Sequence, residues 1–149
     1  MLKETIRILL ARDLARLSGE VEAYRDEANL WRVEKGITNS AGNLCLHLAG
    51  NLNTYIGAIL GQTGYVRNRE MEFTQKDISR NELLGMIRAT AGMADNILAG
   101  LEETALEKEY PVKVFDHEMT TGHFLVHLAA HLGYHLGQIN YYRRLTDAS

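Results

Sequence analysis

Apolar residues recur every three or four positions along four long segments of this chain, which is the spacing of a helix with one buried face. The chain contains a single proline, the residue that most often interrupts a helix. Ser79 and Glu82 form a capping box, a typical helix start. The sequence therefore predicts an all-α fold. The predicted helices run from about Lys3 to Ala28, from Asn39-Ser40 to Gly61 or Gly64, from Ser79 to Leu101, and from Thr120-Thr121 to about Leu145.

Four such helices in 149 residues predict one domain, 1–149, built as a four-helix bundle. The connection from Gln62 to Ile78 is long enough to return along the bundle, so the second and third helices can lie parallel. Connections of this length are often functional, although a solvated charged loop is the simpler interpretation. A second irregular stretch, Glu107 to Met119, contains an alternating pattern compatible with a short extended segment.

Composition excludes several classes of function. The formal net charge of −3 provides no basic footprint for nucleic acid and no polybasic tail for a membrane surface. No apolar run approaches the roughly 20 residues that span a bilayer, and the N-terminal region lacks a secretory cleavage signal. Cys45 is the only cysteine, so the chain cannot form an internal disulfide. We expect a cytoplasmic location.

Four histidines stand four residues apart in the last predicted helix, at positions 123, 127, 131 and 135. Side chains at this spacing lie one above the other, close enough for two imidazoles to share one metal ion. Each step of four residues also rotates the side chain by about 40° around the helix. Two neighbours of this ladder can therefore reach one ion, but all four cannot, and the remaining ligands must come from another helix.

His47 is the only histidine outside positions 117–135, and it lies in an apolar run of the second helix. A lone histidine there would usually be a neutral core residue, but an imidazole pair on another helix favours a metal site. Spacing alone does not separate the pair His127/His131 from His131/His135. Neutral imidazoles suit zinc, nickel, copper or ferrous iron. A metal ion with three protein ligands and an open coordination position is typical of catalytic sites. Because the chain has a single cysteine, it cannot form the common structural zinc sites that use two to four cysteines.

Two short motifs resemble those of the DinB-like (DinB/YfiT) superfamily, and the likeness covers nearly the whole chain. They are His47-Leu-Ala-Gly-Asn51 and His131-Leu-Gly-Tyr-His135-Leu-Gly-Gln138. The stretch Arg67-Asn-Arg-Glu-Met-Glu-Phe73 resembles an uncharacterised subgroup. The resemblance implies a four-helix bundle of up-down-down-up topology, a divalent metal (Zn, Ni or Fe) on His47, His131 and His135, and frequently a homodimer. Family members of known activity include thiol transferases that use mycothiol, bacillithiol or glutathione.

The last motif departs from the commoner family pattern His-His-Arg-Gly-Gln, because this chain has Tyr134-His135-Leu136-Gly137-Gln138. Asn51, one turn after His47, can orient that ring or a bound water, or form an ordinary bond between helices. His127 can lie beside the ligands or near a substrate, or simply pack. Tyr134, Tyr141 and Tyr142 are expected to pack, and Gly133 and Gly137 to allow close approach of another helix.

We therefore predict a metal-dependent enzyme in which the ion activates a thiol or a water, with a small-molecule substrate. The alternative is a non-catalytic dimer that binds a metal or a ligand. No glutamate follows a ladder histidine as in His-Glu-x-x-His, so the sequence gives no support to a metalloprotease.

Overall fold

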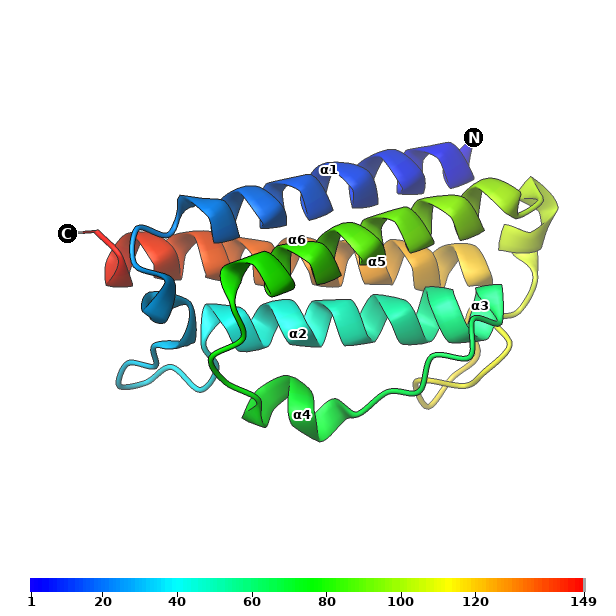
Figure 1. Ribbon diagram of the computed structural model, residues 1–149. Helices are drawn as coiled ribbons and strands as arrows, with labels where there is room; N and C mark the ends of the chain where they lie inside the picture. Colours follow the sequence, from blue (N-terminus) through cyan, green and yellow to red (C-terminus); the bar gives the residue numbers. More distant parts are fainter. Residues whose placement is uncertain (149) are drawn as a thin grey trace.

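The computed structural model describes residues 1–148, and its regular elements are helices (Figure 1). The all-α prediction is confirmed for these residues, in which β pairing is confined to one isolated bridge between Glu109 and Thr120. The second helix continues through a π-helical segment, η2 (Asn53–Ala58), into α3 (Ile59–Gly61). The long helices are α1 (Leu2–Ala23), α2 (Ala41–Leu52), α5 (Arg80–Gly100) and α6 (Thr121–Thr146).

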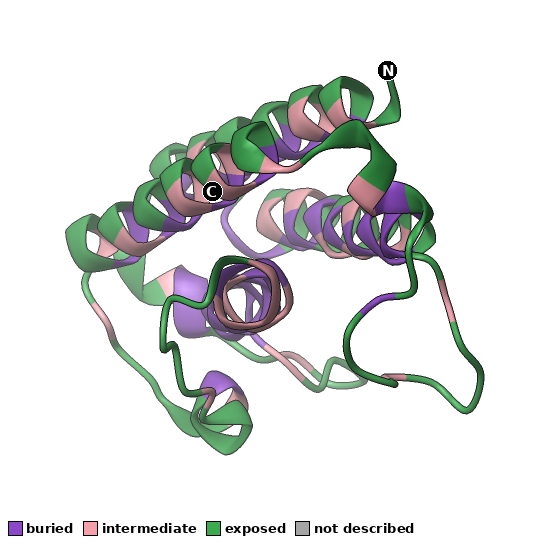
Figure 2. Ribbon diagram, turned by 90° about the vertical axis from the view of Figure 1, so that its right-hand side faces the viewer, coloured by how far each residue is buried: buried purple, intermediate pink, exposed green. Residues whose placement is uncertain are grey.

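The long helices pack around one apolar core. α1 contacts α5 and α6, and α2 contacts α5 and α6 from the other side. In Figure 1, α2 and α5 run in one direction, whereas α1 and α6 run in the other. The connection between α3 and α5 returns along the outside of α2 and carries a short helix, α4 (Arg69–Thr74), which packs on α2. Figure 2 shows that the buried faces of the long helices turn inward.

Three helices begin where the sequence predicts, because a hydroxyl side chain accepts a bond from a free amide of the first turn. Ser40 Oγ accepts from Asn43 N at 3.1 Å, and Ser79 Oγ accepts from Glu82 N at 3.1 Å. Thr120 Oγ1 accepts from His123 N at 3.1 Å. These caps fix the starts of α2, α5 and α6, and those of α2 and α6 thereby set the register of their histidines.

The predicted end of the first helix at Ala28 is wrong, because α1 ends at Ala23. The Asp147 carboxylate accepts the backbone amides of Arg25 at 2.6 Å and Asp26 at 3.2 Å, which draws the chain away from the helix. A separate 3-10 helix, η1 (Glu27–Trp31), follows. Local periodicity could not reveal this ending, since the group that captures the amides lies at the other end of the chain.

The packing predictions for α6 hold in part. Tyr142 is buried, but Tyr134 and Tyr141 are 66% and 64% exposed, so their predicted packing is wrong. A Cβ added to Gly137 would meet no atom within 4 Å, and one at Gly133 only an oxygen of Asp13 at 3.7 Å. Neither glycine is therefore required for close helix approach within the chain. Both lie on an accessible face of α6.

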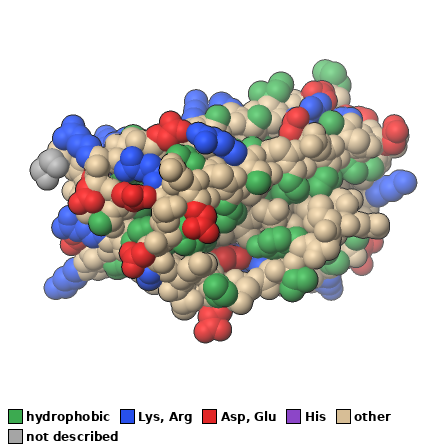
Figure 3. All heavy atoms as spheres, viewed as in Figure 1, with side chains coloured by type: hydrophobic (Ala, Val, Ile, Leu, Met, Phe, Trp, Pro, Cys, Tyr) green, Lys and Arg blue, Asp and Glu red, His purple; other side chains and the backbone are tan. Residues whose placement is uncertain are grey.

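The described residues include no membrane-spanning helix, and the face shown in Figure 3 has no large basic patch. Within residues 1–148, no helix combines the length and the apolar character that crossing a membrane requires. On the face shown in Figure 3, Lys and Arg side chains lie among Asp and Glu side chains. No histidine is visible on that face.

Candidate metal centre

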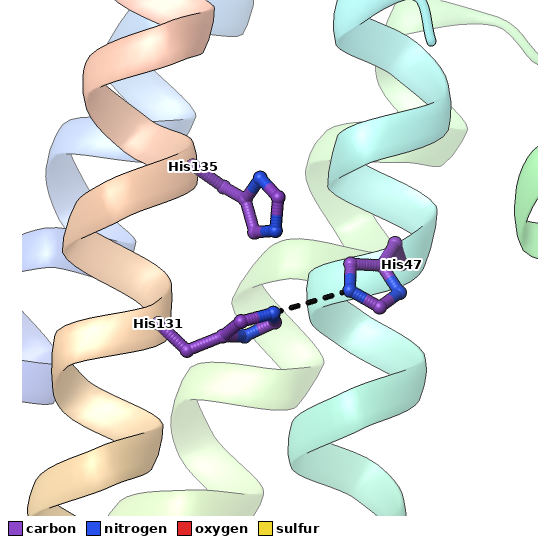
Figure 4. A group of neighbouring side chains, drawn as sticks. All are labelled: His47, His131 and His135. Atoms are coloured by element: carbon purple, nitrogen blue, oxygen red, sulfur yellow. Dashed lines mark hydrogen bonds between the residues drawn. The ribbon is translucent and has the colours of Figure 1, made fainter. Parts of the chain in front are cut away.

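Three histidines from two helices converge in the interior. His47 comes from α2, whereas His131 and His135 come from α6 (Figure 4). One ring nitrogen of each lies within 4.8 Å of those of the other two. The His131 and His135 rings stand edge to face, with centroids 4.6 Å apart. The His47 ring is nearly perpendicular to both, with centroids 5.1 Å from that of His131 and 5.3 Å from that of His135. The three rings thus point their nitrogens at a common point.

The closest contact of the triad fits a shared ion. His47 Nε2 and His131 Nε2 are 3.2 Å apart. Two ring nitrogens bound to one ion at about 2.0–2.1 Å, at tetrahedral or octahedral angles, would be about 2.8–3.4 Å apart. The separation therefore matches one edge of a coordination polyhedron. Neutral imidazole is also a donor that zinc, nickel and ferrous iron accept.

Glu72 fixes the ring of His47. Glu72 Oε1 lies 3.0 Å from His47 Nδ1, and both side chains are buried. Because an ionised carboxylate can only accept, Nδ1 carries the proton, and the lone pair of His47 is on Nε2, which faces the other histidines. A carboxylate behind a metal-binding histidine is a recurring device that orients the ring and raises its basicity.

Arg67 holds Glu72 in turn. Its guanidinium donates from Nε to Glu72 Oε2 at 2.8 Å and from Nη2 to Oε1 at 2.9 Å. The carboxylate also lies directly over the backbone of α2, where a Cβ on Gly50 would come within 1.9 Å of Oε2. Because Gly50 has no side chain, the Glu72 carboxylate can approach α2 closely enough to contact His47.

Asn43 attaches the short helix α4 to α2. Its side-chain nitrogen donates to the backbone oxygens of Glu72 at 3.0 Å and Gln75 at 2.8 Å, and its oxygen accepts from Lys76 Nζ at 2.6 Å. Asn43 is fully buried, so these bonds are shielded from water. The interpretation of residues 62–78 as a solvated charged loop holds only in part: most of the segment is exposed, but its short helix α4 delivers the buried carboxylate of Glu72 to His47.

Gln138 orients His135 in a similar way. Gln138 Oε1 lies 2.7 Å from His135 Nδ1, one turn away on α6. An amide oxygen accepts the Nδ1 proton, which leaves the His135 lone pair on Nε2. Two of the three rings thus have their tautomer set by a partner on the far nitrogen. The third, His131, has a buried Nδ1 without a hydrogen-bond partner among the described residues.

Burial keeps the central histidines neutral. Together with the smaller effect of the neighbouring histidines, burial lowers the pKa of His131 to about 4. Burial also lowers the pKa of His47, against the opposing effect of Glu72. Both rings are therefore available as neutral ligands at neutral pH. By contrast, burial raises the pKa of the Cys45 thiol to about 12, so this fully buried group is not a nucleophile.

The two residues expected beside the ligands take different positions. Asn51 is buried and its Oδ1 has no partner among the described residues, and the position behind His47 that it was expected to fill is taken by Glu72. His127 stacks between Phe124, at 5.8 Å, and His131, at 6.4 Å. Spacing alone could not choose between the two ladder pairs, and the structure brings His131 and His135 to His47.

Sequence reasoning missed Glu72 and Arg67 as parts of the site. They lie on the crossover, twenty or more residues from His47, and no local spacing links them to it. One signal was available. Gly50 stands in the middle of an apolar helix three residues after His47, and an isolated glycine in a helix indicates close approach of another group.

Comparison with known proteins gives the family but no activity. A sequence search finds no match among curated proteins. A model of a family described as proteins of unknown function, DUF1572, matches residues 6–148. The match includes all three converging histidines together with Glu72 and Arg67. The chain therefore belongs to the DUF1572 family.

Proposed function

We propose that His47, His131 and His135 bind one divalent metal ion and that the chain is a metal-dependent enzyme resembling the thiol transferases of the DinB-like superfamily. The observation that carries the proposal is the convergence of three ring nitrogens within 4.8 Å, two of them 3.2 Å apart. Zinc, nickel and iron all suit this donor set. Three protein ligands leave at least one position of the ion open to a small molecule.

The residues of the chain prepare this site for chemistry. An ion held by three neutral imidazoles keeps its full charge and lowers the pKa of a thiol or water at its open position. Glu72 and Gln138 hold two of the rings with their Nε2 lone pairs inward. Burial keeps His47 and His131 unprotonated, so protons do not compete with the metal near neutral pH.

Metal analysis of purified, untagged protein tests the binding step. We expect about one equivalent of metal per chain in the wild type, because one triad holds one ion. The His135→Ala variant should lose it, whereas His123→Ala should retain it. His123 is an exposed member of the same ladder and lies outside the triad, so it is a matched control. Equal metal content in all three proteins would exclude a site on the triad.

Thiol consumption tests the reaction. Metal-loaded protein is mixed with a low-molecular-weight thiol (glutathione, bacillithiol or mycothiol) and an electrophile, and free thiol is followed over time. Consumption should be lost in His131→Ala and retained in His123→Ala. Wild-type protein that binds metal but consumes no thiol above the His131→Ala background would contradict the transferase. Hydrolysis by the same site is the nearest variant, since a water can occupy the same position.

A non-catalytic metal- or ligand-binding protein is the second candidate. It is favoured by the bonds of Glu72, whose carboxylate already accepts from His47 and from both Nε and Nη2 of Arg67. A carboxylate occupied in this way is not free to act as a general base. Turnover that requires His47, His131 and His135 together would eliminate this candidate.

We also propose, from the same resemblance, that the long helices form a four-helix bundle of up-down-down-up topology and that the chain is a homodimer. Support for the topology comes from the parallel course of α2 and α5 in Figure 1. Sedimentation velocity of the purified protein tests the dimer, which should sediment with twice the mass of one chain.

A further inference from the structure

An open pocket of about 680 Å³ borders the triad at His135. It lies between the C-terminal half of α6, the loop that precedes α2, and the first turn of α2. Its volume is within the range of small-molecule sites in proteins, roughly 300–1,000 Å³. The lining residues include Ile37, Asn39 and Leu44 on one side and Tyr134, His135, Gln138, Tyr141, Tyr142 and Leu145 on the other.

The pocket wall is mainly apolar and carries no Asp, Glu, Lys or Arg among the described residues that line it. Leucine, isoleucine and tyrosine side chains make up most of it, and Thr38, Asn39, His135 and Gln138 are its polar members. A phosphate, carboxylate or ammonium group would find no ion partner there, and its desolvation would be uncompensated. An uncharged apolar group would instead be transferred from water to an apolar surface, which is favourable in proportion to the area covered.

The pocket reaches the proposed metal ligands at its inner end. His135 is part of the wall, and Leu44 lies one turn before His47 on the same side of α2. The amide of Gln138, also in the wall, already binds His135 Nδ1. A molecule in this pocket would therefore have its body against leucine and tyrosine side chains and one end beside the triad.

The walls are held in place before any ligand binds. The Tyr142 hydroxyl accepts from Glu34 N at 2.8 Å and donates to Arg32 O at 3.1 Å, which ties the loop before α2 to α6. A wall fixed in this way loses little conformational freedom when a ligand enters, which favours binding.

We propose that this pocket binds the uncharged, apolar part of the substrate and directs its polar end to the histidine triad. The proposal rests on the metal site proposed above and adds the substrate class to it. A small molecule is the favoured occupant, because the pocket has the volume of a ligand site and a proposed metal ligand in its wall. A second copy of the chain seated on the same face is a separate outcome of the test.

Alkyl hydroxamic acids with two to eight carbons test the proposal, since the head group binds divalent metals and the tail alone varies. Dissociation constants are measured by calorimetry on zinc-loaded protein. Affinity should rise roughly two- to fourfold with each added methylene if the tail is buried in the pocket. The slope against tail length is the readout, because effects on the head group change all members equally.

Two double variants separate the pocket from general surface effects. Tyr141→Gln with Leu145→Gln makes the outer wall polar and should flatten the slope. Ile8→Gln with Val126→Gln replaces two apolar side chains that are also exposed but do not line the pocket, and it should keep the wild-type slope. All four residues are exposed, so the replacements leave the core intact.

The outcomes decide between the site and its pocket. Acetohydroxamic acid that binds without any gain from longer tails would overturn the pocket and leave the metal site intact. If no zinc is retained, 1-hexanol tests the pocket alone: amide shifts at Tyr141 and Gln138 by NMR would support it, and their absence would overturn it. A third outcome is that the Tyr141→Gln, Leu145→Gln variant sediments as a monomer while its affinity keeps the wild-type dependence on tail length. That result would assign the pocket face to a second copy of the chain and overturn the proposal.

Discussion

Replacing Glu72 by Gln should weaken metal binding, although Glu72 contacts His47 and not the proposed metal itself. Glutamine keeps an acceptor for His47 Nδ1 but removes the charge that strengthens this bond. A hydrogen bond to a charged group contributes about 1.5–3 kcal/mol, and a neutral one about 1 kcal/mol. The difference, about 0.5–2 kcal/mol, corresponds to a loss of roughly 2- to 30-fold in affinity. Mutating the partner behind a metal-binding histidine generally costs 10- to 100-fold, which agrees.

The same change also affects folding, and the two effects have to be separated. The Arg67 and Glu72 side chains are 14% and 6% exposed, so Glu72→Gln leaves a buried guanidinium without its counter-charge. Breaking a buried ion pair from one side destabilises a protein by up to about 3–5 kcal/mol. In the double variant Arg67→Met, Glu72→Gln both charges are gone. Its free energy of unfolding should recover relative to Glu72→Gln, while its metal affinity should stay low.

Competition with a chromophoric chelator measures the affinity of each protein for zinc, and urea denaturation of the metal-free proteins measures stability. Nitrogen-15 NMR of the His47 ring reports which nitrogen carries the proton. We expect the proton on Nδ1 in the wild type and a loss of this preference in the variants. Wild-type zinc affinity in Glu72→Gln, with the His47 proton unmoved, would refute the reasoning that this carboxylate prepares the ligand.

Gly50→Ala should weaken zinc binding in the same direction, because the new Cβ would lie 1.9 Å from Glu72 Oε2 and push the carboxylate away from His47. Gly85→Ala, whose Cβ meets no atom within 4 Å, should leave zinc affinity unchanged in the same chelator assay. In metal-free protein, the free energy of unfolding should fall by about 1–3 kcal/mol from pH 6.5 to pH 4. The reason is that the unfolded chain takes up a proton at His131 in this window, whereas the folded chain, with its pKa lowered to about 4, does not. Urea denaturation across this range should show a smaller slope in His131→Gln, and an unchanged slope there would contradict the assignment.

The helices could be predicted from the sequence, and so could the proximity of neighbouring ladder histidines, because both depend on local periodicity. The choice of His131 and His135 over His127 and His131 came from the family resemblance. Ser40, Ser79 and Thr120 cap the helices that the spacing of apolar residues indicates. Two histidines four residues apart on one helix must be neighbours wherever the helix lies. The end of α1 could not be predicted in this way, since the carboxylate that captures its last amides belongs to Asp147.

The remainder of the site depends on the crossover between α3 and α5. Glu72 reaches His47 only because Asn43 binds the backbone of α4 and Gly50 leaves room for the carboxylate. None of these three contacts follows a helical or strand period, so hydrophobic patterning carries no information about them. The charged residues at 67–72 suggested a solvated loop because charge is usually exposed. A buried charge requires a partner, and Arg67 provides it from the same segment.

The ladder shows how a small rotation separates the two histidines that converge on His47 from those that pack elsewhere. Successive histidines on α6 drift by about 40° per step, so a neighbouring element can approach at most two of them closely. His131 and His135 lie with ring centroids 4.6 Å apart and face His47, whereas His127 lies 6.4 Å from His131, against Phe124 and Phe115. The choice is made by α2, whose His47 stands at the level of the last two ladder positions. The position of α2 along α6 therefore decides which of the two equally spaced pairs, His127/His131 or His131/His135, lies beside His47.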